Sequence, residues 1–233
     1  MKRADYGLDA PGVVRTMGTI GLALVLIVRV LPVPIGLKSA ATWMGASFLL
    51  SGLAMIASSR FGKMRARDSL LNAVAIKPED TVLDIGCGRG LLLMGAAKRA
   101  TNGHAIGIDL WSNVDQMNNS RAATLGNAEA EGVSERVEVK DGDMRSLPFA
   151  DGSIDAVVSS LAIHNLKGSV DRDTAVREIV RVLKPGGRVG IIDIANVGRY
   201  VEVLKESGMT IASGPGISPW IFPPARVVVA TKP

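Results

Sequence analysis

The sequence predicts an α/β protein with a doubly wound, mainly parallel sheet behind an apolar N-terminal segment. From about residue 60 to the end, short apolar strands alternate with helices, which is typical of βαβ crossovers. A glycine-rich loop follows the first of these strands, where parallel sheets bind their ligands. Before residue 60, two long apolar stretches are separated by a short connector that contains two prolines.

The N-terminal segment predicts a transmembrane hairpin with spans at about residues 13–31 and 39–59. About 20 apolar residues are enough to cross ~30 Å of hydrocarbon. Ala41 and Gly45 in the second span have the spacing of small residues that lets helices approach closely. The alternative is a buried helical pair that caps a soluble domain, but residues 39–59 have no polar face. We therefore expect two regions, a tail and membrane hairpin at 1–59 and a second domain at 60–233.

Charge is distributed unevenly along the chain, whose formal net charge is +5. Residues 1–67 contain nine Lys and Arg against two Asp, whereas the remainder has a slight acidic excess. The basic residues flank the two apolar stretches, so the positive-inside rule places both termini and the second domain on the cytoplasmic side of a membrane. The larger part of the chain has no positive field to attract phosphates, so nucleic acid is not an expected partner.

Cysteine and histidine are rare, with one Cys and two His in the whole chain. This excludes an internal disulfide framework and a multi-cysteine zinc site. It also argues against a His-rich metal centre, and we expect no metal.

The second domain has a predictable order of elements. Strands are expected at 81–85, 104–109, 137–141, 154–159, 188–194 and 226–231, and helices at 60–75, from the glycine loop to about 100, at 116–131, 171–183 and 198–207. Residues 213–224 are the least regular stretch. There Trp220 and Phe222 either line an apolar mouth or dip into the membrane interface, and the alternative is a rigid connector.

The loop after the first strand predicts a nucleoside cofactor without a pyrophosphate. Gly86, Gly88 and Gly90 permit close backbone approach to a ligand. The dinucleotide fingerprint needs Gly or Ala at the sixth position from Gly86, where Leu91 stands, so an NAD-linked oxidoreductase is disfavoured. Asp84 can help to position an ammonium group but would repel pyrophosphate.

Two further strand ends carry polar groups suited to a nucleoside. Asp109 ends the second strand, where a carboxylate can accept from both ribose hydroxyls. Asp143 and Met144 follow the third strand. A carboxylate there can accept from the adenine amino group, and the methionine can lie on the ring.

Together these segments resemble the class I S-adenosylmethionine-dependent methyltransferases over about residues 68–233. The motifs that carry the resemblance are Asp84-x-Gly86-x-Gly88-x-Gly90, Gly107-Ile108-Asp109, Gly142-Asp143-Met144, Leu147-Pro148-Phe149 with Ile154-Asp155-Ala156-Val157-Val158, and Leu183-Lys184-Pro185-Gly186-Gly187. The resemblance implies a seven-stranded sheet of order 3-2-1-4-5-7-6 with a reversed last strand. It also implies S-adenosylmethionine as cofactor, bound by Asp84, the three loop glycines, Asp109, Leu110 or Trp111, Asp143, Met144 and Ser159.

The fourth strand departs from one branch of that family. It continues as Ser159-Ser160-Leu161-Ala162-Ile163-His164-Asn165 instead of the Asn/Asp-Pro-Pro-Tyr of many base and protein-amide methyltransferases. This is similar to the small-molecule and lipid branches. His164 lies just past the carboxyl end of the strand and can act as a general base, the catalytic residue we predict. The alternative is a histidine that only shapes the pocket.

These observations predict a membrane-anchored methyltransferase that acts on a small or amphipathic acceptor. A lipid-headgroup or quinone methyltransferase is the alternative within enzymes. A module that binds S-adenosylmethionine without catalysis is the alternative from another class.

Overall fold

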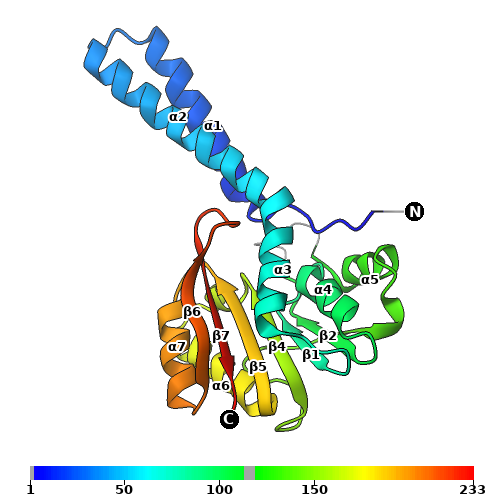
Figure 1. Ribbon diagram of the computed structural model, residues 1–233. Helices are drawn as coiled ribbons and strands as arrows, with labels where there is room; N and C mark the ends of the chain where they lie inside the picture. The colour runs from blue at the N-terminus through cyan, green and yellow to red at the C-terminus, as the bar shows by residue number, and fades with distance from the viewer. Residues whose placement is uncertain (1–2, 113–118) are drawn as a thin grey trace.

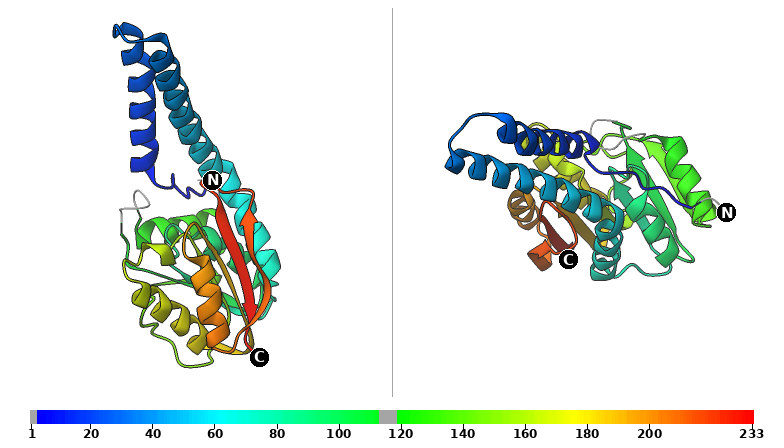
Figure 2. Two further views of the ribbon diagram at one scale, coloured as in Figure 1. Left: turned by 90° about the vertical axis from the view of Figure 1, so that its left-hand side faces the viewer. Right: turned by 90° about the horizontal axis from the view of Figure 1, so that it is seen from above.

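The computed structural model describes residues 3–112 and 119–233. A helical hairpin projects from one end of an α/β domain (Figures 1 and 2). The hairpin consists of α1 (Pro11–Val30) and α2 (Ile35–Ala57). Helix α1 and the continuous helix Ile35–Val74, which begins with α2, are long and apolar enough to cross a membrane, and 11% and 17% of their most apolar windows is buried.

The two hairpin helices meet at a pair of glycines. A Cβ on Gly45 would lie 2.7 Å from the carbonyl oxygen of Gly21, and a Cβ on Gly21 would lie 2.8 Å from that of Gly45. Both contacts are shorter than packing allows, so glycine is required on each side. The sequence pattern identified Gly45, whereas its partner Gly21 had no such signal.

The hairpin enters the domain through one continuous helical rod. Helix α2 runs into a π-helical turn, η1 (Ser58–Gly62), and then into α3 (Lys63–Val74) without a non-helical residue. A π-turn is often a functional feature of a helix. The expected division between residues 59 and 60 falls within this π-turn, where the helix is continuous.

The sheet has seven strands in the order β3-β2-β1-β4-β5-β7-β6, as the resemblance implied. The strands are β1 (Thr81–Ile85), β2 (His104–Asp109), β3 (Val137–Asp141), β4 (Ile154–Ser160), β5 (Leu183–Asp193), β6 (Thr210–Ser218) and β7 (Ala225–Thr231). Strand β7 runs antiparallel to both of its neighbours, β5 and β6, and the other neighbouring pairs are parallel.

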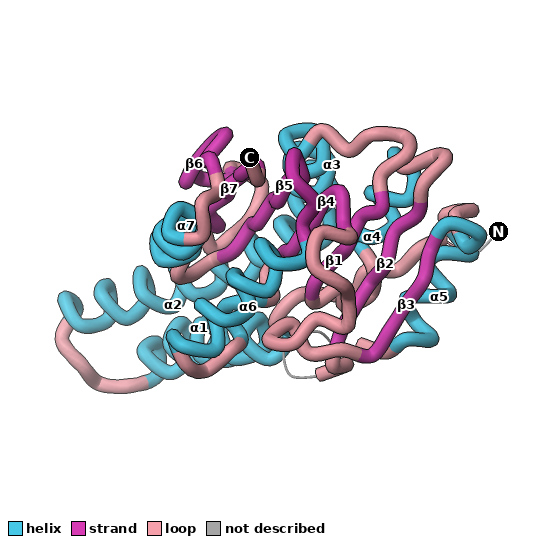
Figure 3. Tube along the Cα trace, turned by 90° about the horizontal axis from the view of Figure 1, so that it is seen from below, coloured by secondary structure: helices cyan, strands magenta, loops and turns pink. Residues whose placement is uncertain are grey.

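Helices cover both faces of the sheet (Figure 3). On one face α3, α4 (Leu91–Arg99) and α5 (Arg121–Ala130) pack through apolar residues such as Leu71, Leu93 and Ala128. On the other face α6 (Ser169–Val182) and α7 (Val197–Glu206) pack through residues such as Ile179 and Leu204. The short turns η2 (Ser134–Arg136) and η3 (Ile163–Asn165) complete the described elements.

The structure differs from the sequence-based elements mainly at the edge strand β6. Its sequence contains Gly214, Pro215 and Gly216, and we expected no strand there. Proline is tolerated on an edge strand because one side of the strand has no ladder partner. The pairing of β6 with β7 is also irregular between Ile211 and Ser213 and between Ser213 and Gly216. The helix expected at 116–131 is α5 from Arg121, and residues 116–118 lie outside the described part.

The carboxyl ends of the parallel strands face the hairpin. The chain ends on β7 at the side of the domain far from the hairpin (Figure 1), and β5 runs antiparallel to β7. Strand β5 and the strands parallel to it therefore end on the side from which the hairpin emerges. Ligands of open α/β sheets bind at this edge.

Candidate functional site

The glycine loop joins β1 to α4 through three residues in the left-handed region. Gly86, Gly88 and Gly90 have φ values of +68°, +50° and +83°, where only glycine is unstrained. Gly86 also lies against the segment after β4, because a Cβ on it would be 2.4 Å from the Cβ of Ala162 and 3.5 Å from the Cε of Met144. The loop, Met144 and the segment that leads to His164 are thus brought together, as the sequence predicted.

Asp109 connects the end of β2 to the glycine loop. Its Oδ2 accepts a hydrogen bond from the Gly88 backbone N–H at 2.8 Å. Its Oδ1 accepts from the Trp111 N–H at 2.6 Å and from the Asn119 amide at 3.2 Å. Asp109 therefore sets the shape of the loop from the end of β2.

The residues after Asp109 form an exposed corner. Leu110 is 64% exposed, which leaves its side chain available to a ligand. Trp111 has φ +60° and its indole N–H donates to Asp141 at 2.6 Å. A non-glycine residue at positive φ is strained by roughly 1–3 kcal/mol, and such strain gathers at functional sites.

Asp84 is buried at the end of β1. Burial raises the pKa of its carboxyl group to about 8, a hydrogen bond from the Leu93 backbone N–H partly offsets that effect, and the charge of Asp109 adds to it. Among the described residues, Oδ2 of Asp84 has no hydrogen-bond partner. An uncompensated buried oxygen of this kind is suited to a cation.

Asp143 and Met144 lie in the loop after β3. The Asp143 carboxylate is held by the guanidinium of Arg145, at 2.6 Å for the closest pair of atoms, and this hydrogen bond is the main reason its pKa is lowered. Arg145 also contacts Asp171 at 3.3 Å. Asp143 is therefore ionised at neutral pH, but an adenine amino group would share it with Arg145.

Ser159 does not reach the surface of the loop. It is 1% exposed, and its hydroxyl donates to the carbonyl oxygen of Ile85 at 3.0 Å. This contact ties the end of β4 to the start of the glycine loop. Its geometry gives Ser159 a supporting position, in contrast to the direct ligand contact implied by the resemblance.

His164 faces a carboxylate that the sequence analysis did not identify. Its Nδ1 lies 2.5 Å from Oδ1 of Asp193 at the end of β5, and its backbone N–H donates to Oδ2 at 3.1 Å. The imidazole is partly exposed and Asp193 is buried. A carboxylate on Nδ1 fixes the tautomer and orients Nε2 as the proton acceptor.

Two more residues support this His–Asp pair. The Tyr200 hydroxyl, on α7, lies 3.4 Å from Oδ2 of Asp193, and burial together with that carboxylate raises the pKa of the tyrosine. Arg172 on α6 donates to the carbonyl oxygen of Leu166 at 2.6 Å, which holds the segment after His164. The pair and the segment after His164 are therefore held from α7 and α6.

The N-terminal tail also reaches the glycine loop. Asn127 on α5 exchanges two hydrogen bonds with the backbone of Asp5, at 2.8 and 2.9 Å, and donates to the carbonyl oxygen of Arg89 at 2.8 Å. Arg89 in turn donates to the Asp5 carboxylate at 2.7 Å. Lys63 holds the following residues by donating to the Gly7 carbonyl at 2.6 Å. Residues 5–9, the strap, thus connect the hairpin to the loop.

The remaining candidates for chemistry are few. Burial, with Asp84 and Asp109 close by, raises the pKa of the Cys87 thiol well above its usual value, so it is neither a nucleophile nor a thiolate ligand. Residues 3–112 and 119–233 contain no cluster of three His, Cys, Asp or Glu able to hold a metal ion.

Of the residues that the sequence analysis missed, Asp193 had a usable signal. It ends an apolar strand in the same way as Asp109, and carboxyl ends of parallel strands meet at one edge. Tyr200 and Asn127 had none, since each is defined only by a contact between distant elements.

Comparison with known proteins agrees with these motifs. Residues 83–191 match the family described as methyltransferase domain. A demethylmenaquinone methyltransferase of Lactobacillus johnsonii is 32% identical over 54% of this chain, and a chloroplastic 2-phytyl-1,4-beta-naphthoquinone methyltransferase of Arabidopsis thaliana is 35% identical over 57%. The chain spans about half of each relative, 49% in both cases.

A solved structure shares the fold. An S-adenosylmethionine-dependent methyltransferase from Aquifex aeolicus superposes with a TM-score of 0.58 at 19% identity, over 71% of this chain and 88% of that one. Its likeness extends the match beyond the motifs to the arrangement of the sheet and its helices.

Proposed function

We propose that this chain, which belongs to the class I S-adenosylmethionine-dependent methyltransferases, transfers a methyl group to a small, lipophilic acceptor reached at a membrane surface. The observation that carries the proposal is the convergence of the glycine loop, Asp109 and the His164–Asp193 pair at the sheet edge from which the hairpin emerges.

The residues present fit the cofactor. The three left-handed glycines shape the loop at the carboxyl end of β1, and Asp84 offers a buried oxygen without a partner among the described residues. In this proposal Asp84 and the three glycines hold the methionine part, Asp109 accepts from the ribose, and Asp143, Met144 and Leu110 surround the adenine. When bound, S-adenosylmethionine supplies an electrophilic methyl group on a sulfonium.

The chain's own residues position and deprotonate the acceptor. His164 Nε2 accepts the proton of an acidic O–H, N–H or C–H group, and Asp193 stabilises the imidazolium that forms. Displacement at a methyl group is in line, so the remaining contribution is orientation and exclusion of water.

The acceptor class follows from the hairpin and the relatives. The segment after β4 is aliphatic and ends in His164, and the relatives' names refer to lipophilic naphthoquinones. We propose that α1 and α2 anchor the chain, with the domain boundary at the π-turn and the site on the cytoplasmic side. Lys and Arg flanking the hairpin support this orientation. A quinone or the headgroup of a lipid would then reach the site from the bilayer.

The second candidate is a module that binds the cofactor without catalysis. Isothermal titration of the detergent-solubilised full chain tests what the two candidates share: both predict binding of S-adenosylmethionine and S-adenosylhomocysteine but not NAD, and absence of binding to all three contradicts both. Transfer of a labelled methyl group to a lipophilic acceptor then supports the methyltransferase, and cofactor binding without transfer supports the binding module.

A further inference from the structure

An aromatic and basic surface surrounds the point where the hairpin enters the domain. Phe61 on η1 is 65% exposed, and Trp220 and Phe222 in the β6–β7 connection are 42% and 39% exposed. Arg60 and Arg65 are exposed beside them. We call these five residues the collar. None of them takes part in the site described above, and exposed aromatic residues gathered in this way mark an interaction surface.

The collar is fastened to the rod by specific contacts. The backbone N–H of Phe222 donates to the Ser58 hydroxyl at 2.9 Å. A Cβ on Gly62 would lie 1.9 Å from the carbonyl oxygen of Trp220, so the connection packs directly on the helix backbone. The Arg65 guanidinium lies 5.4 Å from the centre of the Trp220 ring. The aromatic side chains are therefore held at a fixed height along the rod.

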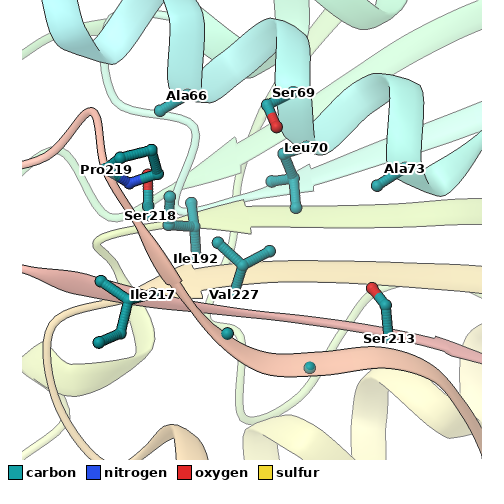
Figure 4. Close-up of a pocket in the computed structure, with 12 residues that line it drawn as sticks. Ala66, Ser69, Leu70, Ala73, Ile192, Ser213, Ile217, Ser218, Pro219 and Val227 are labelled. Carbon is teal, nitrogen blue, oxygen red and sulfur yellow. The ribbon is translucent and has the colours of Figure 1, made fainter.

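An open hollow of about 510 Å³ lies between the collar's aromatic residues and the C-terminal end of α2. Ile217 and Pro219 also line this hollow. The same two residues border a second hollow of about 280 Å³ between α3 and β6 (Figure 4). Helix α7 packs on β6, but the face of β6 toward α3 is open along this hollow. The apolar surface thus continues from the hairpin onto the domain.

We infer that the collar docks the domain onto the interfacial layer of an anionic bilayer, an inference that rests on the membrane anchoring proposed above. Two features identify the bilayer as the partner: the basic collar is complementary to anionic headgroups, and its apolar surface is continuous with that of the hairpin. Trp favours the headgroup level, Phe is common on the apolar face of interfacial segments, and Arg residues beside a membrane helix attract anionic lipids. No acidic side chain belongs to the collar.

Docking at the collar fixes the orientation of the site. The β6–β7 connection and the carboxyl ends of the parallel strands lie on the same side of the domain. A domain seated on the collar holds the mouth of the site against the lipid surface. The collar is therefore a device for presenting the site to acceptors dissolved in the membrane.

Site-specific fluorescence in nanodiscs tests this inference. An environment-sensitive maleimide dye is placed at Pro224→Cys, next to the collar, or at Ser134→Cys on the opposite side of the domain; native Cys87 is buried. In discs containing one third anionic lipid, we expect the dye at 224 to emit at shorter wavelength and to be quenched by brominated acyl chains. The dye at 134 should keep the emission wavelength of a water-exposed dye and should not be quenched by brominated acyl chains.

Charge variants complete the design. Arg60→Gln with Arg65→Gln should lower the quenching at 224 at least twofold in anionic discs, and the matched pair Lys77→Gln with Lys205→Gln should not change it. A dye at 224 that reports water while the chain stays in the disc overturns the docking and leaves the anchoring intact. A wavelength shift without lipid quenching assigns the collar to a protein contact and also overturns it. Loss of the chain from the disc instead contradicts the anchoring itself.

Discussion

At the scale of single residues, the His164–Asp193 pair carries the proposed proton transfer. If His164 is the base, His164→Ala should lower kcat by roughly 10²–10⁴ and leave the affinity for S-adenosylhomocysteine unchanged. Asp193→Asn should also lower kcat and move the acid limb of the kcat–pH profile to lower pH, because the imidazolium loses its carboxylate.

Tyr200→Phe serves as the control for that experiment. It removes the hydroxyl 3.4 Å from Asp193 and keeps the buried ring, so its effect on the pH profile should be small. Wild-type kcat from pH 6 to 9 in His164→Ala would restrict His164 to lining the pocket.

Asp109 makes the most specific cofactor contact that we propose. Asp109→Ala removes a charge-assisted pair of hydrogen bonds to the ribose, each contributing about 1.5–3 kcal/mol. It also frees the Gly88 N–H, so we expect cofactor affinity to fall at least tenfold in calorimetry. Glu138→Ala, on an exposed position of β3, is the control, and unchanged affinity in Asp109→Ala would reject the ribose assignment.

Asp84 should make stability depend on pH. Its pKa is about 8 in the folded chain and near 3.9 when unfolded. Between these values the folded chain holds a proton that the unfolded chain has released. The neutral carboxyl therefore makes its full contribution to the free energy of unfolding below about pH 4. As the pH rises from there to 8, this contribution is lost by up to about 1.4 kcal/mol per pH unit.

Denaturation of the cofactor-free full chain at pH 5 and pH 8 measures this effect. The isosteric variant Asp84→Asn should unfold at nearly the same denaturant concentration at both pH values, whereas the parent chain should be less stable at pH 8. Equal pH dependence in the two chains would mean that Asp84 is already ionised in the fold.

At the scale of elements, the sequence predicted the strands that follow an apolar run but not β6. Strands β1 and β2, in the interior of the sheet, begin and end at the predicted residues, because most of their residues are buried between two layers of helices. Strand β6 contains Gly214 and Pro215 and exposes most of its residues. Its formation depends on pairing with β7, which no local pattern encodes.

The same reasoning separates the predicted and unpredicted parts of the candidate site. Gly86 and His164 come just after a strand and Asp109 is the last residue of one. The predicted topology therefore already placed all three at one edge of the sheet. The strap's hydrogen bonds between Asp5 and Asn127 join residues that are 122 positions apart in the sequence. No local sequence pattern indicated them. Asp193 could have been identified from its place at the end of β5.

The hairpin yields a prediction at the same scale. Because α1 and α2 are apolar and exposed over most of their surface, we expect the full chain to sediment with membranes and to resist extraction by alkaline carbonate. Since the apolar surface of α1 and α2 drives the chain into the membrane fraction, the double variant Leu22→Lys with Leu53→Lys should release much of the protein into the soluble fraction. A full chain that stays in the soluble fraction without detergent would contradict the anchoring.

At the scale of the whole molecule, the features lie on one side. The side toward the proposed membrane carries the hairpin, the strap, the glycine loop, the His164–Asp193 pair and the collar, whereas the C-terminus lies on the opposite side. This arrangement gives a physical reason for fusing a methyltransferase domain to a hairpin. An acceptor dissolved in lipid would meet the site by moving along the bilayer surface.

The most direct test is transfer of a labelled methyl group from S-adenosylmethionine to molecules extracted from membranes. The full chain in nanodiscs is incubated with labelled cofactor and a total lipid extract, beside His164→Ala and a reaction without lipid. The account predicts label in the organic phase that depends on both the lipid and His164. Binding of S-adenosylhomocysteine without any lipid-dependent transfer, or transfer only to water-soluble acceptors, would contradict it.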